Sequence, residues 1–294
     1  MRRLIGFFIN YVILLITGIF AGGIGALIGV GGGFIVIPVM FLGLDMPAQA
    51  VVGISLTMVF FNALSSSITY WRQKRIDLTT GWKFTLATIP GAILGSQLAA
   101  YFTNQGFGVT FGLVLILVAV LMFFRGDSRE AQSTRNIQQE KKRVKETAQQ
   151  KTERRTKRAG WVERVYQDAE GKVHYYSFNE YLGIGLSLGV GFLSSALGIG
   201  GGIIHVPLMV MLMHFPPHVA TATSLFILTG SSLVGSISHL FLGHFVWPPA
   251  IALSIGGILG AQIISRQSVK IKGRNIIKVF AVVLFLVGWQ MMLG

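Results

Sequence analysis

Residues 29–38 read GVGGGFIVIP, and residues 198–207 read GIGGGIIHVP, a near copy 169 residues later. Each stretch places a glycine cluster inside an apolar run and closes it with a proline. Glycine tolerates unusual backbone dihedral angles and lets other groups approach closely, whereas proline kinks or ends a helix. Helices broken at matching positions of two apolar halves are typical of the binding site of a transporter.

The composition around these stretches predicts a membrane protein. The 294-residue chain is 52% hydrophobic and only 12% charged, with a mean hydropathy of +0.64, against about 25% charged residues in soluble domains. The first apolar run has no small-residue cleavage site, so we expect no cleavable signal peptide. Several apolar runs approach or reach the roughly 20 residues that span a bilayer. They are residues 12–28, 51–68, 84–102, 107–124, 181–197, 220–242, 248–264 and 276–293.

The formal charge of +14 is unevenly distributed, which argues against a nucleic-acid partner. Residues 125–178 hold 14 of the 25 basic residues and 8 of the 11 acidic ones. Most other bases lie in short loops and at the ends of apolar runs, the distribution that keeps basic loops of membrane proteins in the cytoplasm. The absence of cysteine excludes disulfides and thiolate metal sites.

The chain divides into a first membrane repeat (residues 1–124), a charged cytoplasmic linker (residues 125–178) and a second membrane repeat (residues 179–294). In the linker, residues 128–158 alternate in charge and predict a solvated helical or disordered arm. The β-prone runs VERVYQ and KVHYY flank AEG and predict a small hairpin. The linker is either a tether, which we favour, or a regulatory or lipid-contacting element.

The two membrane segments align with each other at a constant offset of 169, which indicates an internal duplication. The offset pairs the two glycine clusters, Pro38 with Pro207 and Ser55 with Ser224. With a four-residue deletion, GAILGSQL at residues 91–98 then aligns with GGILGAQI at residues 256–263.

The basic loops predict how the two repeats are oriented. Placing residues 72–75, 125–178 and 266–274 all in the cytoplasm requires inverted repeats of five segments each, with the short pieces after the glycine clusters counted as crossings. The alternative is two parallel four-crossing repeats with re-entrant short pieces, which would export residues 266–274. We therefore expect an all-α polytopic membrane protein with two inverted repeats of four to five helical segments and glycine-broken helices.

The paired motifs resemble the sulfite exporter TauE/SafE family, also called the toluene sulfonate uptake permease family. The resemblance lies in LIGVGGGFIVIPVM, MPAQAVVGISL and PGAILGSQLA of the first half, and in LGIGGGIIHVPLM, FPPHVATATSL and GGILGAQI of the second. It does not cover residues 125–178, which are longer and more charged than the family's short central loop. It implies an inner-membrane protein that moves sulfur-containing anions such as sulfite, sulfoacetate, thiosulfate or sulfonates.

The candidate site is built from helix starts and buried polar groups. Helix N-termini offer free N–H groups and about half a positive charge, so the glycine clusters can present amides to an anion; the alternative is close helix packing by small residues. Buried hydroxyls, amides and the unmatched His205 need either a bound anion or an interhelical bond, and the paired glutamines are expected deep in apolar helices. The candidate substrate-binding residues are Gly31, Gly32, Gly33, Ser55, Asn62, Gln97, Gly200, Gly201, Gly202, His205, Thr223, Ser224 and Gln262.

The sequence therefore predicts a secondary transporter of a sulfur-containing or related organic anion, working in a lipid bilayer. It contains no phosphate-binding loop and no nucleophile–base–acid set, so we expect gradient-driven transport, no catalytic residues, no metal site and no cofactor. The alternatives are a membrane-anchored sensor that uses the charged linker, and an anion channel. The identity of the anion, the direction, a co- or counter-transported ion and assembly into a homo-oligomer stay open at this point.

Overall fold

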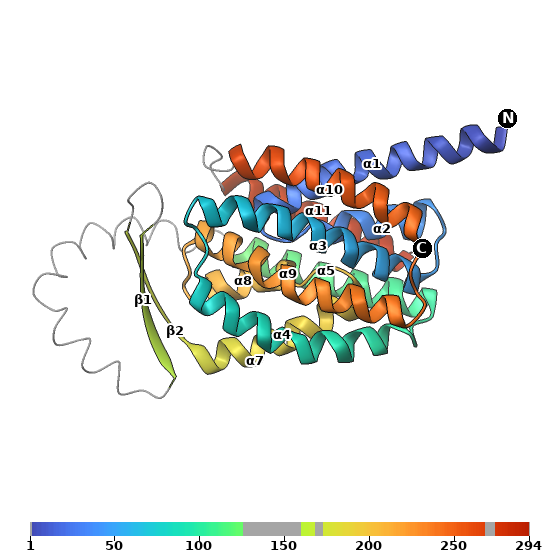
Figure 1. Ribbon diagram of the computed structural model, residues 1–294. Coiled ribbons are helices and arrows are strands. Elements are labelled where there is room, and N and C mark those ends of the chain that lie inside the picture. Colours follow the sequence, from blue (N-terminus) through green and yellow to red (C-terminus); the bar gives the residue numbers. More distant parts are fainter. Residues whose placement is uncertain (1, 126–159, 168–172, 268–273, 294) are drawn as a thin grey trace, which may run out of the picture.

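The computed structural model describes residues 2–125, 160–167, 173–267 and 274–293 as a helical body with one hairpin at its end (Figure 1). The first half contains α1 (Arg2–Ile28), α2 (Gly33–Gly43), α3 (Ala48–Arg72), α4 (Leu78–Ala99) and α5 (Asn104–Arg125). The hairpin is β1 (Trp161–Gln167) and β2 (Val173–Asn179). The second half contains α7 (Glu180–Leu197), α8 (Gly202–Met211), α9 (Pro217–Phe241), α10 (Trp247–Gln267) and α11 (Arg274–Leu293).

Six helical segments of the described chain are long and apolar enough to cross a membrane, which confirms the all-α polytopic class. They are Tyr11–Ile28, Ala48–Arg72, Asn104–Leu121, Glu180–Leu197, Pro217–Phe241 and Trp247–Gln267. Helix α4 has 22 residues but is not among them, although its run was expected to be apolar enough. Two of its hydroxyls are bonded inside the protein, since the buried Thr85 and Thr88 donate to the carbonyls of Gly81 and Thr85.

The short helices α2 and α8 begin directly after the glycine clusters. They contain 11 and 10 residues, too few for either to span a bilayer upright without help at about 1.5 Å per residue. The prolines that close the two sequence stretches do not end these helices, because Pro38 and Pro207 lie inside them. The chain is interrupted by glycine, and proline only removes one donor within each short helix.

The main helix contacts join the two halves of the chain: α1 packs on α10, α4 on α7, α5 on α11 and α3 on α9. Small residues make these crossings close. A side chain at Gly22 would collide with the backbone of Gly257, and one at Gly95 would collide with the carbonyl of Phe192. Lipid offers no hydrophobic drive between helices, so close contact of this kind is a main source of their attraction.

The order of the contacts gives the direction of each pair. Helices α1 and α10 run the same way, since Gly18 lies against Gly256 and Gly23 against Gly260. Helices α3 and α9 run in opposite directions: Thr57 meets Ser236 at 2.5 Å between hydroxyls, whereas Ser67, further along α3, meets the earlier Thr229.

The hairpin packs on the helical body at the end where α4 and α7 begin (Figure 1). Strands β1 and β2 are antiparallel, with Trp161 opposite Asn179. From β2, the buried Tyr176 and Phe178 contact Phe215, with ring centroids 4.3 and 5.1 Å apart. These rings extend into a second core beside Phe84. The arm predicted for residues 128–158 lies outside the described residues.

The crossing of α1 and α10 provides a test of the glycine packing. The substitution Gly22→Ala places a methyl group against the backbone of Gly257. We therefore expect the free energy of unfolding to fall by about 1–3 kcal/mol, measured as a lower melting temperature of the purified protein in detergent. The matched control is Gly189→Ala in α7, where a methyl group would meet no atom within 4 Å. Equal melting temperatures for the two variants would contradict the packing described here.

Candidate functional site

The first helix break is made by left-handed glycines between α1 and α2. Gly29, Gly31 and Gly32 have φ angles of 89°, 87° and 92°, a region that side chains strongly disfavour. Gly32 also caps α2, and a side chain there would collide with the carbonyl of Ala21. Both constraints demand glycine at this position.

The second break, between α7 and α8, has similar geometry. Gly198 and Gly200 have φ angles of 72° and 69°, and Gly201 caps α8. The Gly201 amide donates to Ser194 Oγ at 2.6 Å. One backbone donor of the second break is therefore used within its own half.

The two breaks pack directly on each other. A Cβ atom at Gly33, the first residue of α2, would lie 2.6 Å from the carbonyl oxygen of Gly198. A Cβ atom at Gly202, the first residue of α8, would collide with the carbonyl of Gly29. Each short helix thus begins in contact with the carbonyl of the first glycine of the other break. The contact leaves no room for a methyl group.

Two buried serines bond these same carbonyls from the opposite half of the chain. Ser55 Oγ in α3 donates to Gly198 O at 2.8 Å, and Ser224 Oγ in α9 donates to Gly29 O at 3.0 Å. Both serine side chains are fully buried. The long helix of one half therefore supplies the donor that the broken helix of the other half lacks.

A second pair of matched contacts lies within the halves, one in each. Tyr70 OH in α3 donates to Ala26 O in α1 at 3.0 Å. At the positions 169 residues later, His239 Nε2 in α9 lies 3.2 Å from Ser195 O in α7. A carbonyl only accepts, so Nε2 carries the proton. His239 is thus a structural donor that takes the place of a tyrosine hydroxyl.

Asn62 lies on α3 against the first glycine cluster. Its Nδ2 donates to Gly31 O at 2.6 Å, and its side chain is fully buried. Its Oδ1 is also buried and has no hydrogen-bond partner within the described part of the chain. A buried acceptor without a donor is costly, so Asn62 has an open bonding position at the first glycine cluster.

His205 lies in the first turns of α8, next to the second glycine cluster. Its Nε2 is 3.0 Å from Ser187 Oγ of α7, and its ring stacks on Phe84 at a centroid distance of 6.4 Å. Its Nδ1 is buried and unbonded among the described residues. The ring connects α8 to Phe84, which belongs to the second core under the hairpin.

Three predicted site residues lie elsewhere. Gln97 is exposed on α4, two residues before the helix ends, and so does not lie deep within its helix as expected. Gln262 instead donates to Ser65 O at 3.2 Å and to Ser65 Oγ at 2.7 Å. The Thr223 hydroxyl accepts a bond from the Asp77 amide at 3.0 Å, so it serves the start of α4, although the adjacent Ser224 bonds the first glycine cluster.

The matched glutamines differ because their surroundings differ. Gln262 faces α3, which offers the Ser65 hydroxyl. The position that the 169-residue offset pairs with Ser65 is Val234, which has no hydroxyl. Gln97 therefore has no equivalent partner and lies on the outer face.

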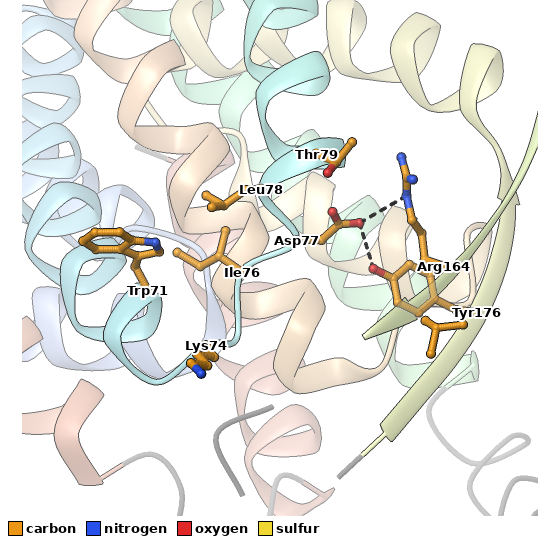
Figure 2. A pocket seen from close by; sticks show the side chains of 9 residues that line it. Trp71, Lys74, Ile76, Asp77, Leu78, Thr79, Arg164 and Tyr176 are labelled. Atoms are coloured by element: carbon orange, nitrogen blue, oxygen red, sulfur yellow. Dashed lines mark hydrogen bonds and ion pairs between the residues drawn. The ribbon is translucent and has the colours of Figure 1, made fainter. Parts of the chain in front are cut away.

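Asp77 is a buried charged residue that the sequence reasoning did not select. It caps α4: its Oδ1 accepts from the Thr80 amide at 3.1 Å and its Oδ2 from Thr80 Oγ1 at 2.5 Å. The hairpin adds a bond from Tyr176 OH at 2.8 Å and the guanidinium of Arg164, whose Nε is 3.9 Å away (Figure 2). An aspartate followed by Leu-Thr-Thr indicates a helix cap, but no local pattern shows that the hairpin reaches it.

No group of three histidine, cysteine, aspartate or glutamate side chains capable of holding a metal ion occurs among the residues the structure describes. The polar groups near the glycine clusters are hydroxyls, amides, one histidine and backbone atoms. Such uncharged donors suit an anion better than a cation, because no carboxylate opposes it.

A polytopic helical body with two broken helices meeting at its centre is an architecture typical of membrane transporters. The family model for sulfite exporter TauE/SafE matches residues 14–291. The probable membrane transporter protein YunE of Bacillus subtilis (strain 168) is 32% identical over 289 residues, covering 96% of this chain and 97% of that protein. The probable membrane transporter protein MJ0441 of Methanocaldococcus jannaschii is 25% identical over 296 residues, covering 96% and 95%.

The chain belongs to the TauE/SafE family, which confirms the resemblance of its motifs, and it is a multi-pass membrane transporter of the inner membrane. No solved structure matches it.

The serine bonds between the halves can be tested by removing each donor. Ser55→Ala and Ser224→Ala each leave a buried carbonyl unsatisfied, so we expect each to lower stability by about 1 kcal/mol and both together to lower it further. The control is Ser96→Ala, because Ser96 Oγ donates only within its own helix, to Ile93 O. Thermal unfolding in detergent measures the effect, and a Ser55→Ala variant as stable as the control would refute it.

Proposed function

We propose that this protein is a secondary transporter of sulfur-containing or related organic anions, of the sulfite, thiosulfate, sulfoacetate and sulfonate class. The anion binds where the two broken helices meet. The observation that carries this proposal is the convergence of two helix starts, Gly33 of α2 and Gly202 of α8, on one buried point. Membership of a family named for sulfite export supports the substrate class.

Backbone amides are suited to this task. The first N–H groups of a helix have no partner within it, and the helix dipole adds about half a positive charge. An anion that meets two such ends is stabilised without a buried lysine or arginine, which is costly in a membrane. The Oδ1 of Asn62 adds an acceptor that suits a protonated oxygen such as that of bisulfite.

The described conformation is closed at the site, because the first residues of α2 and α8 each touch the opposing carbonyl. Binding therefore requires the two breaks to separate. The Ser55–Gly198 and Ser224–Gly29 bonds join elements of opposite halves. Separating the two breaks therefore requires these hydrogen bonds to break. A hydroxyl released from its carbonyl becomes a donor to the anion.

Inverted repeats give this movement a symmetric basis. Two observations support inversion: α3 and α9 run in opposite directions, and the α3–α4 loop, the hairpin and the end of α10 lie at one end of the body. The loop after α3 meets the end of α10 there, where Gln73 donates to Ser265 O beside Arg266, and the hairpin bonds Asp77 at the start of α4. We assign this end to the cytoplasm, as basic loops require.

The test is uptake of labelled sulfite, thiosulfate and sulfoacetate into proteoliposomes containing the purified full-length chain. Flux that saturates with concentration and follows an imposed pH or sodium gradient is expected for at least one of the three. Flux without saturation would replace this proposal with an anion channel. No flux of any of the three anions in folded protein would reject the substrate class.

A matched pair of variants tests the location of the site. Asn62→Asp places a negative charge beside the first glycine cluster, and we expect at least a tenfold lower flux because the anion is repelled. Gln97→Glu makes the same amide-to-carboxylate change at the exposed end of α4 and should keep the flux near that of the original protein. Equal losses in the two variants, measured on protein of unchanged elution profile, would place the site elsewhere.

A further inference from the structure

Lys74 adopts a backbone conformation that ordinarily calls for glycine. Helix α3 ends at Arg72, and Lys74 follows with φ +49° in the left-handed region. The Lys74 amide donates to Trp71 O at 2.9 Å and the Arg75 amide to Tyr70 O at 3.1 Å. This pair of bonds is a Schellman motif, whose left-handed position is most often glycine.

The second half of the chain builds the same helix end with glycine. After α9, Gly243 has φ +75°; its amide donates to Leu240 O at 3.2 Å, and the His244 amide donates to His239 O at 3.1 Å. Gly243 is the position that the 169-residue offset pairs with Lys74. The lysine is therefore not needed for the turn, and it carries a conformational cost that glycine avoids.

The Lys74 side chain lines an open pocket of about 460 Å³ between the α3–α4 loop and the hairpin. Arg164 of β1 lies on the same pocket, and in the view of Figure 2 Asp77 lies between the two. Lys74 forms no ion pair with a carboxylate of the described residues. Within the part of the chain that the structure describes, its charge is thus unpaired.

The carboxylates nearby are already engaged. Asp77 accepts three bonds, two from Thr80 and one from Tyr176. Glu180 is bound by Lys83 Nζ at 2.8 and 2.9 Å, with Arg164 at 3.7 Å. Lys83 and Arg164 are therefore paired with the two carboxylates, and Lys74 adds a positive charge to the pocket without such a pair, which favours an anion.

A second, apolar pocket of about 440 Å³ adjoins the first. It is lined by Trp82, Lys83 and Phe226, and shares Leu78 and Thr79 with the pocket of Lys74. Trp71 and Trp82 are 61% and 59% exposed at this end of the body. Exposed tryptophans are typical of the interface between headgroups and acyl chains.

We propose that these two pockets form one binding site for an anionic phospholipid, with its phosphate at Lys74, its headgroup extending toward Arg164 and an acyl chain along Leu78, Trp82 and Phe226. Basic pockets on the cytoplasmic side of membrane helices bind such headgroups. The apolar pocket, continuous with the basic one, is what favours a lipid over a free anion. Because Arg164 belongs to the hairpin and Lys74 to the α3–α4 loop, the lipid joins the two.

The experiment uses the full-length protein, delipidated in detergent and titrated with dioleoylphosphatidylglycerol or dioleoylphosphatidylcholine while thermal unfolding is followed. We expect the anionic lipid to raise the melting temperature and the zwitterionic lipid to do so much less. Lys74→Gly should fold, since Gly243 shows that the turn accepts glycine, but should weaken the apparent affinity for the anionic lipid about fivefold. Lys74→Gln removes the charge but keeps the left-handed strain, and should weaken it equally.

The control is Arg72→Gln, which removes one positive charge from the same helix end but does not line the pocket. It should keep the response to the anionic lipid. An equal loss in Arg72→Gln would show a general surface-charge effect and overturn the site, as would an unchanged response in both Lys74 variants. Glycerol 3-phosphate or sulfite at matched concentration should not reproduce the shift; if either does, the pocket binds a free anion and the lipid assignment fails.

Discussion

A break in a helix within a bilayer exposes carbonyls that lipid cannot satisfy, and the rest of this structure depends on how two such carbonyls are bonded. Gly29 O and Gly198 O each receive a serine hydroxyl from the long central helix of the opposite half. The donors are reciprocal, so neither half is complete alone. The helix breaks depend on these two hydrogen bonds between the halves, and the same contacts fix where the two short helices begin.

Glycine allows the two halves to make this contact both because of its backbone freedom and because of its small size. At Gly29 and Gly32 it permits the left-handed backbone, whereas at Gly33 and Gly202 it admits an opposing carbonyl. The same property brings α1 onto α10 and α4 onto α7 with little side-chain material between them. Van der Waals contact and buried hydrogen bonds thus take over the role that the hydrophobic effect has in a soluble core.

Local sequence was enough to predict the membrane class, the helix breaks and the family, because hydropathy and glycine chemistry act within a few residues. The partners of polar groups were harder to predict. GAILGSQL and GGILGAQI look alike, yet Gln262 finds Ser65 and Gln97 lies exposed. Asp77 was missed as a contact of the hairpin because Tyr176 is 99 residues away. The role of the glycine clusters in binding, and the orientation of the repeats in the bilayer, stay predictions.

The pairing of α1 (Arg2–Ile28) with α10 (Trp247–Gln267) has a consequence for biogenesis. Ribosomes deliver the chain from its N-terminus, so α1 enters the membrane long before its partner is synthesised. Until Ser224 arrives, the Gly29 carbonyl of the nascent first half lacks its donor. A chain stalled or cleaved between the halves therefore carries an unsatisfied carbonyl in the bilayer, a polar defect that the finished molecule lacks.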